Sequence, residues 1–109
     1  MNFDMNKMLQ EAQRMQAELA KAQEEAASEV VEASAGGGMV TVKANGAGDV
    51  VSISIDPRAI DPDDPELLAD MVLAAVNEAL RSGRALMESK MSGLMPGGLG
   101  GLEGLLPGA

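Results

Sequence analysis

The fold is decided by the stretch from Gly46 to Met91, which reads GAGDVVSISIDPRAIDPDDPELLADMVLAAVNEALRSGRALMESKM. A turn at 46–49 leads into a strand predicted over 50–55, because Val and Ile alternate there with Ser. The strand is expected to stop at Asp56-Pro57, since Pro carries no N–H to donate to a neighbouring strand. One side of this strand is apolar and needs a cover.

A helix is predicted after the elbow IDPDDPE at 60–66, and it runs to about Met91. Asp64 can accept backbone N–H groups as the N-cap, Pro65 supplies a suitable φ at the first position, and Glu66 favours the positive end of the dipole. This strand, elbow and helix contain no residue typical of an active site. The segment is therefore interpreted as a scaffold for binding or assembly.

Upstream of Gly46, the sequence predicts two further strands. Residues 29–32 are a weak candidate, the glycines at 36–38 form a turn, and residues 39–45 alternate between apolar and polar. The helix after the elbow carries a wide apolar stripe, interrupted at Gly83, where either a bend or close packing is expected. We expect the stripe to cover the apolar side of the last two strands, at Val40, Val42, Val51, Ile53 and Ile55.

A first helix is predicted over about 2–25. Its apolar and small residues recur every three or four positions, as in a coiled-coil seam: Met5, Met8, Ala12, Met15, Leu19, Ala22 and Ala26. A parallel row alternates in charge: Asp4, Lys7, Glu11, Arg14, Glu18, Lys21 and Glu25. Since the second helix already covers the sheet, the seam lacks a partner in its own chain. It predicts a homodimer whose interface contains Met8, Ala12, Met15 and Leu19.

The predicted class is α+β, in the order α-β-β-β-α, with a small antiparallel sheet covered by a long C-terminal helix. Residues 1–91 are expected to form a single domain that dimerises. Residues 92–109 hold seven Gly and two Pro and are expected to be a flexible tail.

Composition excludes several kinds of function. The chain of 109 residues has no His and no Cys, so catalytic pairs, redox chemistry and metal sites built on them are absent. We expect no enzyme activity, cofactor, metal or small-molecule substrate. No signal peptide is evident, and no apolar run approaches the ~20 residues of a membrane span. The net charge of −9 repels polyanions, so any nucleic-acid binding must come from local basic clusters.

The same segments resemble the YbaB/EbfC family of small bacterial nucleoid-associated proteins over about residues 5–92. The resemblance lies in the order and spacing of KMLQEAQRMQAEL at 7–19, MVTVKANG at 39–46, GDVVSISIDP at 48–57 and LLADMVLAAVNEAL at 67–80. It implies a tweezers-like homodimer, located in the cytoplasm and the nucleoid. It also implies binding of double-stranded DNA, with little sequence preference and a change in DNA conformation.

The basic positions of the family's terminal helices are matched by Lys7, Arg14, Lys21, Arg81, Arg84 and Lys90. Each has a structural alternative. For those of the first helix the alternative is pairing with the neighbouring acids, and for those of the second it is a favourable interaction with the negative end of a helix dipole. Arg81 and Arg84 are interpreted as the least neutralised pair, since they are the only charges between Glu78 and Glu88.

Two further hypotheses compete with DNA binding. In one, the protein is an adaptor for DNA-processing machinery, and its acidic surface contacts other proteins. The other, a small hydrolase, lacks any evident base to activate a Ser. Base-specific readout is not expected, because no helix-turn-helix or zinc-finger spacing occurs.

Overall fold

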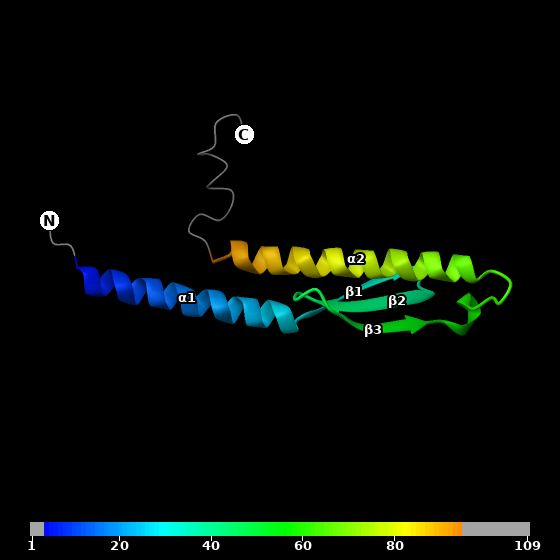
Figure 1. Ribbon diagram of the computed structural model, residues 1–109, viewed down its shortest axis with the longest axis horizontal. Helices are drawn as coiled ribbons and strands as arrows, with labels where there is room; N and C mark the ends of the chain where they lie inside the picture. Colours follow the sequence, from blue (N-terminus) through cyan, green and yellow to red (C-terminus); the bar gives the residue numbers. More distant parts are fainter. Residues whose placement is uncertain (1–3, 95–109) are drawn as a thin grey trace, which may run out of the picture.

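In the computed structural model, which describes residues 4–94, two long helices flank a three-stranded sheet (Figure 1). In chain order the elements are α1 (Met5–Ser28), β1 (Val30–Ala35), β2 (Val40–Asn45), β3 (Val50–Ile55), the short 3-10 helix η1 (Pro57–Ala59) and α2 (Pro65–Ser92). The predicted α+β class and α-β-β-β-α order are confirmed. Neither α1 nor α2 is long and apolar enough to cross a membrane.

Some boundaries differ from those predicted. Helix α1 continues to Ser28, and β1 extends three residues beyond its predicted end, because pairing with β2 sustains a strand that is weak by local preference. Ser92, which was expected to begin the tail, still belongs to α2. The rest of the predicted tail falls almost entirely on 95–109, outside the described residues.

Both helices begin with an Asp cap. The side chain of Asp4 accepts a hydrogen bond from the Lys7 N–H, and that of Asp64 accepts one from the Leu67 N–H, each at 3.2 Å. Pro65 occupies the first turn of α2, as predicted. These contacts satisfy N–H groups that have no partner within the helix, so the start of α2 is fixed by its local sequence.

The sheet is antiparallel, in the order β1-β2-β3. Its helix-facing side is buried at Val40, Val42 and Ala44 of β2, which pack against Ala75 and Ala79 of α2. The fully buried residues of this core are all Val or Ala, so the helix and the sheet approach closely.

The prediction that α2 also covers the apolar side of β3 is wrong. Val51 is 49% exposed, Ile53 48% and Ile55 36%. Helix α2 lies along β1 and β2 and barely touches β3. A helix about 10 Å across spans roughly two strands at about 4.8 Å spacing, so the third strand lies outside its footprint.

One tight junction joins α1, the β2–β3 turn and α2. Ala22 and Ala26 at the end of α1 are buried, and the Gly46 N–H donates to the Ala26 carbonyl oxygen at 3.1 Å. A Cβ at Gly83 would lie 2.5 Å from the carbonyl oxygen of Asn45. Of the two alternatives expected at Gly83, close packing is therefore the one found. Beyond this junction, the first turns of α1 extend past the end of α2 (Figure 1).

Candidate nucleic-acid interface

The basic residues of α1 form an exposed row. Arg14 lies between Glu11 and Glu18, with N–O distances of 3.9 and 3.6 Å. Within residues 4–94, the ammonium groups of Lys7 and Lys21 have no carboxylate within 4.0 Å. The expected neutralisation of this row by neighbouring acids is thus seen at Arg14 and not at the two lysines.

Arg81 and Arg84 lie together on α2, beside the β2–β3 turn. They line a hollow of about 300 Å³ with Gly48, Asn77 and Leu80. The spacing of Asn77, Arg81 and Arg84 places all three on one side of the helix. The spacing of Asn77 from Arg81 and Arg84 is visible in the sequence and is the signal that could have predicted its place in the hollow. Gly48 lines the hollow because two segments that are far apart in the chain meet there, so no local sequence pattern predicts its place.

The two arginines differ in how far they are neutralised. The guanidinium of Arg81 donates two hydrogen bonds to Oε2 of Glu78, one turn earlier, at 2.7 and 3.2 Å. Arg84 is exposed and forms no ion pair with any residue from 4 to 94. The expectation of a weakly neutralised pair therefore holds for Arg84 and not for Arg81. The Glu78 contact is itself exposed, so it holds Arg81 only weakly.

Lys90 has a structural contact. Its Nζ lies 3.1 Å from Oε2 of Glu29, the C-cap residue of α1. The pair joins the last turns of α2 to the start of the sheet. A cation at this end of α2 also suits the helix dipole, as the alternative interpretation held.

Arg58 is paired within its own segment, just after β3. Its Nη2 donates to Oδ2 of Asp56 at 2.7 Å and its Nε to Oδ1 at 3.1 Å. Hydrogen bonds from the side chain and the backbone of Arg58 hold the pKa of the Asp56 carboxyl below its ordinary value. The same contact raises the pKa of Arg58. The pair keeps both charges at every physiological pH and adds no net positive charge to the surface.

The acidic elbow before α2 serves local turns. Oδ1 of Asp61 accepts the Asp63 N–H at 2.9 Å, and Asp64 caps the helix. In the part of the chain that the structure describes, no three acidic side chains gather closely enough to hold a metal ion.

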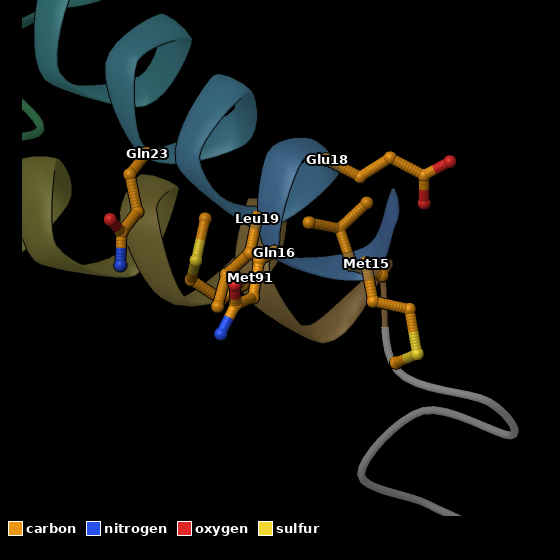
Figure 2. A pocket seen from close by; sticks show the side chains of 7 residues that line it. Met15, Gln16, Glu18, Leu19, Gln23 and Met91 are labelled. Carbon is orange, nitrogen blue, oxygen red and sulfur yellow. The ribbon is translucent and has the colours of Figure 1, made fainter. Parts of the chain in front are cut away.

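An apolar groove of about 460 Å³ separates the seam of α1 from the end of α2 (Figure 2). Met15 and Leu19 of α1 and Met91 and Leu94 of α2 line it, together with Gln16, Glu18 and Gln23. Met8 and Ala12, further along the seam, are exposed. The four seam residues predicted to meet a second copy thus remain accessible, while Ala22 and Ala26 are buried within the chain.

Comparisons with known proteins agree with this architecture and with the resemblance noted in the sequence. The YbaB/EbfC DNA-binding family matches residues 1–99. A nucleoid-associated protein of Acetivibrio thermocellus is 48% identical over 102 residues, which cover 94% of this chain and 89% of that protein. One of Chloroflexus aurantiacus is 46% identical over 103 residues, covering 94% and 99%.

A solved structure supports the fold independently. The crystal structure of an uncharacterised protein from Helicobacter pylori superimposes with a TM-score of 0.63 at 24% sequence identity. The alignment covers 77% of this chain and 88% of that one. The two proteins share the α-β-β-β-α fold.

Proposed function

The chain belongs to the YbaB/EbfC DNA-binding family, and on that premise we propose that it is a nucleoid-associated protein of the cytoplasm. It binds double-stranded DNA with little sequence preference and alters the conformation of the duplex. The observation that carries this proposal is the hollow beside the β2–β3 turn, where Arg81 and Arg84 are exposed together. Family membership favours this function over that of a protein adaptor.

The charge of the chain determines how DNA can bind. A net charge of −9 repels the duplex at long range, so binding depends on the few places where cations gather. Two guanidinium groups on one side of a helix suit neighbouring phosphates, because Arg presents several donors in a planar fork. Phosphate contacts position a protein without selecting a sequence.

Helix α1 provides a second set of contacts in this proposal. Lys7, Arg14 and Lys21 recur every seven residues, which corresponds to about 10.5 Å along the helix. Lys7 belongs to the first turn of α1. The first turns of α1 extend past the end of α2, so a duplex can approach them without meeting α2 (Figure 1). Lys90 contributes less, since Glu29 already pairs with it.

We also propose that the protein acts as a homodimer. A second copy doubles the arginine hollow, and two separated contact sites allow one particle to bend or bridge DNA. Among residues 4–94, two apolar surfaces of the single chain are uncovered. One is the α1 seam at Met8, Ala12, Met15 and Leu19, and the other is β3.

A salt titration tests the DNA-binding proposal. The affinity for a fluorescently labelled random-sequence duplex is measured by anisotropy between 50 and 200 mM salt. If both arginines of both copies contact phosphates, they alone make log K fall against log salt with a slope of about −3.6, from about −0.9 per contact, and the α1 contacts make the slope steeper. A second duplex of unrelated sequence is expected to bind with the same affinity and slope. No binding at 50 mM salt, or binding unaffected by salt, contradicts the proposal.

A further inference from the structure

The apolar seam of α1 is covered only along part of its length. The exposed fraction falls from 66% at Met5 to 51% at Met15 and 41% at Leu19, and Ala26 is fully buried. Helix α2 contacts α1 but ends at Ser92, and the first turns of α1 extend past that end (Figure 1). The seam therefore loses its cover at the point where α2 stops.

The apolar groove lies at this point. Met15 and Leu19 of α1 and Met91 and Leu94 of α2 line its volume of about 460 Å³. The side chains of Leu19 and Met91 lie together, while the carboxylate of Glu18 points away from both (Figure 2). A groove of this size lined by apolar side chains can bind several further apolar side chains.

The chain that continues from the groove is apolar and nearly uncharged. Leu94 lines the groove and is also the last residue that the structure describes. The sequence after it is MPGGLGGLEGLLPGA at 95–109, in which Glu103 is the one charged residue. Gly and Pro disfavour a helix, so this segment needs the surface of another element to bury its large apolar side chains. These are Met95, Leu99, Leu102, Leu105 and Leu106.

We propose that residues 95–109 dock on the α1 seam of their own chain, entering the groove beside Leu94 and continuing towards Met5. The segment then takes over from α2 as the cover of the seam. Its length is sufficient, because α1 rises about 21 Å from Leu19 to Met5 at 1.5 Å per residue. Fifteen residues of extended chain reach about 50 Å. The proposal goes beyond DNA binding and does not depend on it.

Charge favours the chain's own segment over a second copy as the occupant of the seam. In α1 an acidic residue directly precedes every second seam residue: Asp4, Glu11, Glu18 and Glu25. A second copy carries a net charge of −9 towards these carboxylates, whereas the segment 95–109 carries only that of Glu103. The segment is also tethered at the groove. A short tether gives an effective concentration of about millimolar, so weak apolar contacts are enough for docking.

Docking of this kind leaves the basic row of α1 uncovered. Successive residues of a helix are rotated by about 100°, so Lys7 and Arg14 point away from the neighbouring seam residues Met8 and Met15. The docked segment holds the first turns of α1, which extend past α2 (Figure 1). It therefore fixes the position of these cations without covering them.

Paramagnetic relaxation measured by NMR tests the docking. The chain has no Cys, so a spin label attached through Gly104→Cys has a unique position. The methyl signals of Met8 and Met15 on the seam are expected to lose most of their intensity. Met71 is the internal reference and should keep its signal, because it lies beside Gly36, far along α2 from the groove.

Two variants of the labelled chain separate docking from simple nearness of the segment. In the first, three leucines become serine, and the Met8 and Met15 signals are expected to return: Leu102→Ser, Leu105→Ser and Leu106→Ser. The matched control adds the same three hydroxyl groups and keeps every apolar side chain, so the signals should stay weak: Gly98→Ser, Gly100→Ser and Gly101→Ser. Amide hydrogen exchange of α1 between Met8 and Leu19 is expected to be faster in the leucine variant than in this control.

Three results overturn the proposal. One is full intensity of the Met8 and Met15 signals in the labelled chain, and another is a loss of intensity that persists in the leucine variant. The third is an equal loss when the spin label and the isotope are carried by different chains, because the groove then holds the segment of a second copy. Since none of these measurements uses DNA, failure of the docking is separate from failure of DNA binding.

Discussion

Reversing the charge of both arginines in the α2 hollow, by Arg81→Glu with Arg84→Glu, is expected to remove most of the affinity for duplex DNA. In a dimer the change deletes four phosphate contacts and places four carboxylates where the phosphates would lie. With four phosphate contacts, the affinity for DNA falls about 100-fold between 50 and 200 mM salt. Removing these contacts is therefore expected to lower the affinity at least about 100-fold near 100 mM salt. Anisotropy with a random-sequence duplex measures the loss, and the salt slope should become shallower by about 3.6, which leaves the part that the α1 contacts contribute.

The matched control changes the same charge elsewhere. Lys43→Glu with Arg58→Glu also shifts the net charge of each chain by −4, at exposed positions outside the hollow. Its effect on affinity is expected to be much smaller, because it acts only through the long-range field, which salt screens. Equal losses in the two variants would show that net charge, and not the hollow, governs binding. Circular dichroism and molar mass establish that both variants remain folded and dimeric.

The two single substitutions should also differ. Arg84→Glu is expected to weaken binding more than Arg81→Glu, because Glu78 already shares the charge of Arg81. Arg84 has no carboxylate partner within residues 4–94. A larger effect at Arg81 would mean that the Glu78 contact gives way when DNA binds.

The sequence predicted those parts of the fold that depend on neighbouring residues. The start of α2 follows from Asp64 and Pro65, whose cap and backbone geometry act within one turn. Strand β3 follows from the alternation of Ile and Ser, and its predicted limits at Val50 and Ile55 agree with the structure. Local interactions of this kind are readable without knowledge of the fold.

The remaining features depend on distances that no local pattern encodes. The sequence showed an apolar stripe on α2 and an apolar side on β3, and it was natural to pack one against the other. However, helix α2 covers only two of the three strands, so the apolar side of β3 stays exposed. Likewise, the Lys90–Glu29 contact joins residues that are far apart in the chain. The spacing of Glu78 and Arg81 in the sequence allows their side chains to pair. It does not show which rotamers they adopt.

The second large effect is expected at Gly83. In an exposed helix, replacing Gly by Ala stabilises by about 1 kcal/mol. At Gly83 the new Cβ would lie 2.5 Å from the Asn45 carbonyl oxygen, which is backbone and has little room to move. Gly83→Ala is therefore expected to lower the free energy of unfolding by about 1–3 kcal/mol, and Gly83→Val by more. For a domain of this size, each kcal/mol lowers Tm by about 4–8 °C.

Thermal unfolding followed by far-ultraviolet circular dichroism measures this effect, because the chain has no Trp or Tyr to report by fluorescence. Gly93→Ala is the matched control, since a Cβ there meets its nearest atoms at 3.6 and 3.7 Å, in ordinary contact. Its Tm should stay close to that of the wild type. The Asn45–Gly46 turn packs on Gly83 and also bonds to Ala26, so the same close approach sets the direction of α1. If Gly83→Ala raised Tm like an ordinary helix glycine, neither the junction nor the direction of α1 that depends on it would exist in solution.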